Sequence, residues 1–139
     1  MTRIHEIMTR GVAVTRRDET LQAAAQRMRE MDIGSLPVTD GSALCGMVTD
    51  RDIAIRGVAE GMVAQEATVA EVMTEEVRSC SENDSVEQVL EAMGDAQVRR
   101  LPVLDAEHRI VGIVALGDLA TRQSADTDKA LREISTPDR

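Results

Sequence analysis

Apolar side chains recur with helical spacing in two stretches of the chain. In the first stretch, four residues keep the i, i+3, i+4, i+7 spacing of one buried helix face: Leu21, Ala24, Ala25 and Met28. The second stretch repeats this spacing 65 positions later: Val86, Val89, Leu90 and Met93. A predicted cap precedes each stretch, Thr20 in the first case and a Ser85–Gln88 capping box in the second. The pattern predicts two amphipathic helices at equivalent places.

Short runs of β-type residues predict strands on either side of these helices. A strand at residues 12–15 precedes the first helix, and strands at residues 36–39 and 44–48 follow it, with a hairpin-like turn between them. Residues 101–104 and 109–114 occupy the same places after the second helix. A further helix is predicted to begin after the last strand of each half. Each half is therefore expected to fold as β-α-β-β-α.

Three motifs occur twice in the chain. They are an apolar-x-x-apolar-Met-Thr segment, a Leu-Pro-Val-x-Asp motif and a Gly-x-Val-x-x-x-Asp-x-Ala motif, which begin at Ile4, Leu36 and Gly46 and again at Val69, Leu101 and Gly112. This internal duplication predicts an α+β fold of two β-α-β-β-α repeats, related by a pseudo-twofold axis and packed through their sheets. The expected boundaries are residues 1–62 for repeat 1, 63–122 for repeat 2 and 123–139 for a polar C-terminal tail.

The composition is that of an ordinary globular chain. Hydrophobic residues make up 42% and charged residues 29% of the 139 positions, which is enough for a real core. No apolar run approaches the roughly 18 residues of a membrane span, and the N-terminus is charged where a signal peptide is apolar. We therefore expect a cytoplasmic protein without a membrane partner.

The net charge excludes one class of partner. A charge of −9 repels polyanions at long range, so nucleic acid is not an expected partner. The Arg16-Arg17 and Arg99-Arg100 pairs are too short to form a basic stripe.

The cysteines and histidines do not predict a metal site. Cys45 and Cys80 lie in different halves without a CxxC spacing, and we interpret them as small core residues kept reduced. His5 and His108 are far apart in the sequence and lack clustered ligand spacing. No metal is therefore expected.

Candidate binding chemistry lies where a predicted strand runs into a helix. Such a helix start offers unpaired N–H groups, and there the Thr49 hydroxyl and the Asp52 carboxylate add groups suited to the two hydroxyls of a ribose. A carboxylate that only caps its own helix explains the same residues. Asp118 repeats the carboxylate at the equivalent place in the second half, which favours the binding interpretation.

These repeated motifs resemble the CBS domain, named for cystathionine β-synthase, in its tandem pair or Bateman module. The resemblance runs from about Ile4 to Thr121 and includes both copies of each motif. It implies a regulatory protein that binds AMP, ADP, ATP, NAD or S-adenosylmethionine in the cleft between the repeats. It places the ribose on Asp52 and Asp118, assisted by Thr49. The second half has Ala115 in place of the threonine, so unequal affinities are expected.

The resemblance also implies contacts to the phosphate and the base. The residues before Leu-Pro-Val approach the phosphate or base: Gly34 and Ser35 in the first half, Arg99 and Arg100 in the second. Adenine is held by aliphatic and backbone groups, matching Val12, Val14, Val77, Ile33 and Val98. This suits a chain without Phe, Tyr or Trp. Apart from the resemblance, Arg51 lies on the predicted helix after Thr49 and is a candidate phosphate contact, whereas Arg56 is not taken as one. Surface salt bridges with nearby acids explain both arginines equally well. Solvated arginines and plain core packing are the alternative explanations.

These residues allow three functions to be compared. The leading hypothesis is a stand-alone sensor of adenosine nucleotides that signals by a shift between conformations, as a homodimer or through an effector protein in trans. No cofactor is required beyond the regulatory nucleotide. An enzyme is disfavoured because the chain lacks a GxSxG elbow, a Cys–His pair and a Walker loop. The alternative is a structural dimerisation module with degenerate, empty clefts, which Ala115 favours.

Overall fold

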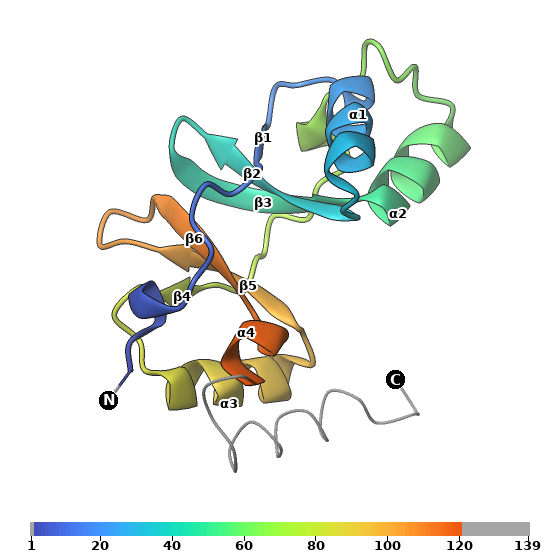
Figure 1. The fold of residues 1–139 in the computed structure, drawn as a ribbon. Helices are drawn as coiled ribbons and strands as arrows, with labels where there is room; N and C mark the ends of the chain where they lie inside the picture. The colour runs from blue at the N-terminus through green and yellow to red at the C-terminus, as the bar shows by residue number, and fades with distance from the viewer. Residues whose placement is uncertain (1, 121–139) are drawn as a thin grey trace. The chain divides into compact units, whose positions relative to one another are not determined.

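The computed structural model describes residues 2–120 of the chain and shows an α+β fold with two three-stranded sheets (Figure 1). This confirms the predicted fold class. The chain divides into two compact units. We call Ala13–Val77 the middle unit, and Met1–Val12 with Arg78–Arg139 the split unit, of which residues 2–12 and 78–120 are described. No helix in the described part of the chain is both long and apolar enough to span a membrane.

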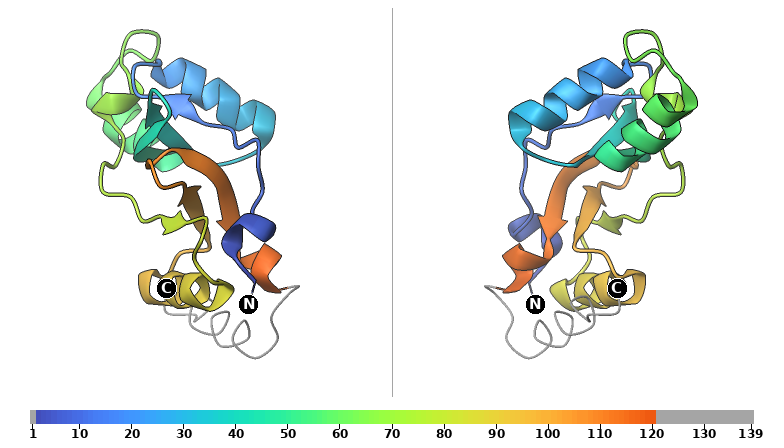
Figure 2. Two further views of the ribbon diagram at one scale, coloured as in Figure 1. Left: turned by 90° about the vertical axis from the view of Figure 1, so that its left-hand side faces the viewer. Right: turned by 90° about the vertical axis from the view of Figure 1, so that its right-hand side faces the viewer.

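The middle unit is built on a sheet of β1 (Thr15–Arg16), β2 (Ser35–Asp40) and β3 (Ala43–Thr49). β1 pairs parallel with β2, and β2 pairs antiparallel with β3, with a register shift between Val38 and Thr39. Helix α1 (Leu21–Met31) covers one face of this sheet (Figures 1 and 2). Thr20 caps α1 by accepting a hydrogen bond from the Ala23 amide, because its hydroxyl satisfies an N–H that the first helical turn leaves unpaired.

The chain after β3 continues as a series of short helical segments. These are α2 (Asp50–Asp52), the π-helical turn η2 (Ile53–Gly57) and the 3₁₀ turn η3 (Val58–Glu60), followed after a connector by the 3₁₀ turn η4 (Val69–Glu71). Gly57 allows close packing here, because a Cβ at this position would stand 2.8 Å from Leu21 Cδ1. The buried core of the unit consists of Leu21, Ala24, Met28, Leu36, Val38, Val48, Val69, Val72 and Met73.

The split unit repeats this plan. The 3₁₀ turn η1 (Ile4–Glu6) comes first, followed by β4 (Cys80–Ser81), α3 (Val86–Ala96), β5 (Arg100–Leu104), β6 (Ile110–Ala115) and α4 (Leu116–Ala120). β4 pairs parallel with β5, and β5 pairs antiparallel with β6. Its core contains Ile4, Ile7, Met8, Cys80, Val86, Val89, Leu90, Met93, Leu101, Val103, Val114, Leu116 and Leu119.

In each unit, the apolar-Met-Thr segment packs on the strands of the other sequence repeat. Thr9 bridges Ile113 in the split unit, and Thr74 bridges Met47 in the middle unit with N···O distances of 2.8 and 2.9 Å. The approach is close enough to require glycine on the adjoining strand. A Cβ at Gly46 would stand 2.8 Å from the Thr74 carbonyl oxygen. The compact unit and the sequence repeat are therefore different divisions of the chain.

Most predicted elements are confirmed, with two local corrections. The first strand is predicted at residues 12–15 but begins only at Thr15, where pairing with β2 starts. Ala25 is predicted in the core, but it is exposed because the sheet covers a narrower face of α1. The Ser85–Gln88 capping box is present, with N···O distances of 2.8 and 3.2 Å. The boundaries 1–62 and 63–122 stay a prediction, and the polar tail lies outside the described residues.

Candidate functional site

Thr49 and Asp52 form a reciprocal pair at the start of α2. The Asp52 amide donates to the Thr49 hydroxyl, and Asp52 Oδ2 accepts from the Thr49 amide, both over 3.0 Å. The capping function is therefore real. Capping does not use all the hydrogen-bonding capacity of the pair. A carboxylate has about four lone-pair sites, and a hydroxyl that accepts a bond can still donate its proton. The Asp52 side chain is 15% exposed, so capping holds its carboxylate in a fixed, partly covered position.

Two other predicted residues lie beside this pair. Ser35 is the ladder partner of Thr49 in the β2–β3 hairpin. The Gly34 carbonyl accepts a hydrogen bond from the Asp50 amide over 2.9 Å. Ile33 packs against the core of the middle unit. We call Ile33, Gly34, Ser35, Thr49 and Asp52 the first cluster. A cavity of about 350 Å³ adjoins it, lined by Met28, Arg29, Asp32, Ile33, Gly34 and Asp50.

The two arginines of the following segment lie differently with respect to Asp52. Arg51 is exposed, and its amide bonds to Asp50 Oδ1 over 2.8 Å. Arg56, which the sequence interpretation left out, lies nearer the carboxylate: its Nε is 3.8 Å from Asp52 Oδ1. Arg56 also donates to the Val72 carbonyl over 3.4 Å. The i, i+4 spacing from Asp52 was the signal that could have identified it.

The split unit gathers the equivalent residues. Arg100 is the ladder partner of Ala115, and the Arg99 carbonyl accepts from the Leu116 amide over 2.8 Å. Asp118 Oδ2 accepts from the Ala115 amide at the longer distance of 3.4 Å. Alanine has no hydroxyl to complete the reciprocal pair. We call Val98, Arg99, Arg100, Ala115 and Asp118 the second cluster, in which Arg99 and Arg100 are exposed and Val98 packs against the core.

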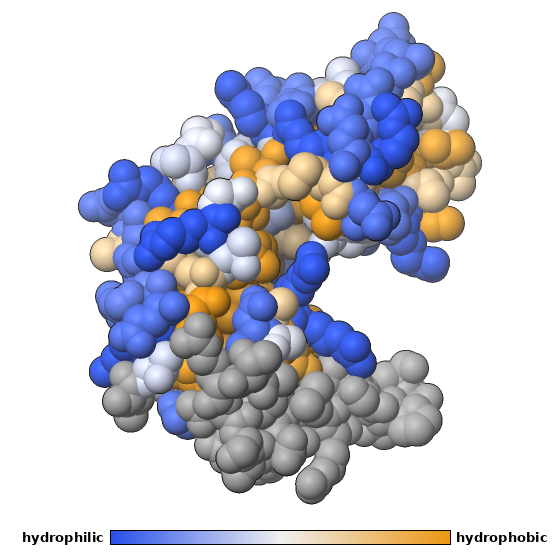
Figure 3. Space-filling view, in the orientation of Figure 1, coloured by the Kyte–Doolittle hydropathy of each residue, from blue (hydrophilic) through white to orange (hydrophobic). Residues whose placement is uncertain are grey.

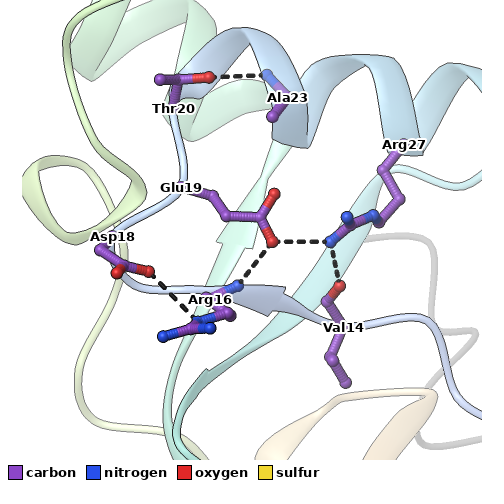
Figure 4. A network of polar contacts seen from close by, with 7 residues as sticks. All are labelled: Val14, Arg16, Asp18, Glu19, Thr20, Ala23 and Arg27. Carbon is purple, nitrogen blue, oxygen red and sulfur yellow. Dashed lines mark hydrogen bonds and ion pairs between the residues drawn. The ribbon is translucent and has the colours of Figure 1, made fainter.

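The three remaining valines, Val12, Val14 and Val77, are half-buried. Val12 ends the first segment of the split unit, and Val77 ends the middle unit. Val14 immediately precedes β1, and its carbonyl accepts a hydrogen bond from Arg27 Nη1 over 2.5 Å (Figure 4). The sequence interpretation missed Arg27, because nothing in the local sequence links α1 to residue 14.

Both cysteine thiols are free; Cys80 is buried and Cys45 is partly buried. Burial, with a smaller contribution from Asp84, raises the pKa of Cys80 to about 12. Burial also raises the pKa of Cys45, although Arg17 opposes the shift. Both thiols are therefore protonated at neutral pH and weakly nucleophilic. Within residues 2–120, no three His, Cys, Asp or Glu side chains are grouped so as to hold a metal ion.

Sequence comparisons connect the chain to known proteins. A sequence model of the CBS domain matches residues 4–57 and 69–125. Hypoxic response protein 1 of Mycobacterium tuberculosis is 46% identical over 121 residues, which span 86% of this chain and 84% of that protein. The CBS domain-containing protein YhcV of Bacillus subtilis is 42% identical over 137 residues, spanning 97% and 96%. Inosine-5'-monophosphate dehydrogenase of Methanocaldococcus jannaschii is 32% identical over 119 residues, which are 85% of this chain and only 23% of the enzyme.

Solved structures share the fold. The crystal structure of Hypoxic Response Protein I with two coordinated zinc ions has a TM-score of 0.77 at 45% identity, covering 88% of this chain and 99% of that one. The CBS domain pair of protein MJ0100, in complex with 5'-methylthioadenosine and S-adenosyl-L-methionine, has a TM-score of 0.69 at 28% identity, covering 87% and 94%. The zinc belongs to the first of these proteins and the adenosine compounds to the second.

Proposed function

The chain belongs to the CBS-domain family, and from this membership we propose that it is a regulatory module that binds an adenosine-containing ligand of the AMP, ADP, ATP or NAD type. The observation that carries the proposal is the fixed carboxylate of Asp52, held by Thr49 beside Gly34 and Ser35. Protein MJ0100 binds two adenosine compounds on the same fold, which supports this ligand class.

The proposed contacts follow from the unused capacity of the first cluster. The free lone pairs of Asp52 accept hydrogen bonds from the ribose hydroxyls, and the Thr49 hydroxyl donates its proton to a ligand oxygen. Arg51 and Arg56 supply positive charge for a phosphate. In the second cluster Arg99 and Arg100 supply the positive charge for a phosphate, and Asp118 binds the ribose. Aliphatic groups of Val12, Val14, Ile33, Val77 and Val98 contact adenine in a chain without aromatic residues.

The two clusters are proposed to bind unequally. In the first cluster both bonds of the reciprocal Thr49–Asp52 pair measure 3.0 Å, whereas in the second the Ala115 amide lies 3.4 Å from Asp118 Oδ2 and alanine has no hydroxyl to form the other half of the pair. A preorganised carboxylate loses less entropy when it binds a ligand. The first cluster should therefore bind more tightly.

The module is proposed to act by population shift, with the ligand favouring one conformation that a partner recognises. Four exposed apolar side chains support a protein contact, such as the homodimer we propose: Met31, Ile55, Val58 and Val63. Apolar surface of the middle unit is visible in orange at the right of Figure 3. An effector in trans and a cytoplasmic location complete the proposal.

Calorimetric titration tests the binding proposal. AMP, ADP, ATP, NAD and S-adenosylmethionine are titrated into the protein, with GMP and GTP as base controls. An adenine compound should bind in the micromolar to millimolar range, and at 100 times its Kd it should add about 2.7 kcal/mol to the free energy of unfolding. Thermal unfolding provides the second measurement.

Substitutions at the two carboxylates assign the sites. Asp52→Asn keeps an oxygen for the Thr49 amide but removes the charge, so it should weaken binding about tenfold or more with little loss of stability. Asp118→Asn should have a smaller effect. Asp95→Asn, at an exposed position in α3, is the matched charge control and should leave affinity unchanged. The reverse order of the two effects would contradict the ranking, and failure of every adenine compound to bind would favour a structural dimerisation module.

A further inference from the structure

Arg27 connects α1 to the chain just before β1. Its Nη1 donates to the Val14 carbonyl over 2.5 Å and to Glu19 Oε1 over 3.1 Å. Glu19 Oε1 also accepts from the Arg16 amide over 3.3 Å (Figure 4). One guanidinium and one carboxylate therefore hold the backbone on both sides of Thr15.

This arrangement compensates for the shortness of β1. The strand has two residues, and its ladder with β2 begins at Thr15. Val14 lies outside the ladder, so Arg27 takes the place of a strand partner for its carbonyl. Both groups of the Arg27–Glu19 pair are partly covered, with side-chain exposures of 37% and 23%, and a charge-assisted bond in that setting is stronger than one in open solvent.

The split unit has the carboxylate half of this arrangement and lacks the arginine. Asp84 occupies the position of Glu19, and its Oδ2 accepts from the Ser81 amide over 2.9 Å. Ala92 occupies the position of Arg27 in α3. No guanidinium can therefore reach Ser79, the counterpart of Val14, from this helix position.

We infer that Arg27 is a positioning residue that fixes Val14 and so preorganises the adenine-contacting backbone of the middle unit, making the two halves unequal as ligand sites. This rests on the proposed function, in which Val14 contacts adenine. Removal of the guanidinium should loosen Val14 in the ligand-free protein. Binding then has to order this backbone, and AMP affinity at the first cluster should fall about tenfold.

NMR of methyl groups tests the inference in two measurements on the full chain. Relaxation of the Val14 methyl groups in the ligand-free protein measures local order, and AMP titration followed at Val14 and at Val98 reports the two clusters separately. Arg27→Ala is compared with Gln26→Ala, an exposed neighbour on the same helix, and with Arg27→Lys, which keeps a donor and the charge toward Glu19.

Arg27→Ala is expected to increase Val14 motion and to weaken AMP about tenfold in the Val14 titration, with the Val98 titration unchanged. Arg27→Lys should restore part of both effects, and Gln26→Ala should match the wild type. Unchanged Val14 order in Arg27→Ala, or equal weakening at both reporters, overturns the inference. If the wild type binds none of the adenine compounds, the proposed function is wrong, and the ligand role of Arg27 is wrong with it, whatever Val14 does.

Discussion

At the scale of single residues, a side chain often combines a structural role with a chemical one. Asp52 caps α2 and keeps lone pairs for a ligand, so neither explanation of the Thr49–Asp52 motif excludes the other. Cys80 illustrates the opposite case. Its thiol is enclosed in the core of the split unit, 3.8 Å from the Pro102 carbonyl oxygen, and burial keeps it protonated and weakly nucleophilic.

Cys80 should make stability depend on alkaline pH. Its pKa rises from about 9.0 to about 12 on folding, so the native state binds a proton more tightly than the unfolded state. The stabilisation is complete below pH 9 and is lost as pH rises toward 12, with a slope of at most about 1.4 kcal/mol per pH unit. Urea unfolding between pH 7.5 and about 10.5 in reductant measures it. Cys80→Ala should flatten this dependence more than Cys45→Ala does, and an equal slope in Cys80→Ala would contradict the assignment.

At the scale of elements, some features depend on residues close together in the sequence, and others depend on packing between distant segments. The boxes at Ser85–Gln88 and Thr49–Asp52 join residues three apart, so a short sequence window is enough to predict them. The glycine in each Gly-x-Val motif is required by a close contact with residues far away in the sequence. Gly46 faces Met73 and Thr74, and Gly112 faces Met8 and Thr9.

Gly46→Ala and Gly112→Ala should therefore destabilise the protein by about 1–3 kcal/mol each. The new methyl group meets a backbone carbonyl at 2.8 Å in the first case and 2.9 Å in the second, and neither carbonyl can move without breaking its bridge. Gly117→Ala is the control, because nothing lies within 4 Å of the point where its Cβ would stand and alanine favours the helix. Urea unfolding distinguishes them, and equal stability of all three variants would refute the packing explanation.

At the scale of the whole molecule, the chain exchanges its apolar-Met-Thr segments between repeats. Residues 4–9 lie at the start of the first repeat but contribute Ile4, Ile7 and Met8 to the core of the split unit. Residues 69–74 precede the strands of the second repeat but contribute Val69, Val72 and Met73 to the middle unit. Each unit therefore depends on sequence that belongs to the other repeat.

Core substitutions should reveal this exchange. Ile4 is fully buried, and Ile4→Ala should cost about 2–5 kcal/mol and reduce hydrogen-exchange protection mainly in β5 and β6. Val69→Ala should cost about 1.5–3 kcal/mol and act mainly on β2 and β3. Loss of protection in the opposite strands for each variant would show that the segments belong to their neighbouring repeats.

The sequence by itself determined the duplication, the buried faces of α1 and α3, the hairpins and the capping boxes, because each depends on residues a few positions apart or on direct repetition. The sequence also led to the hypothesis that Gly34, Ser35, Thr49 and Asp52 form one ligand site. The hairpin register of the structure places Ser35 opposite Thr49. Packing of the repeats through their sheets stays a prediction.

Only the tertiary structure decided which segment completes which core, where β1 begins, that Ala25 is exposed, and that Arg27 holds Val14. These features are contacts between residues far apart along the chain or limits set by a neighbouring surface. Sequence spacing records the periodicity within an element, but it does not record the distance to another element, which exists only once the chain has folded.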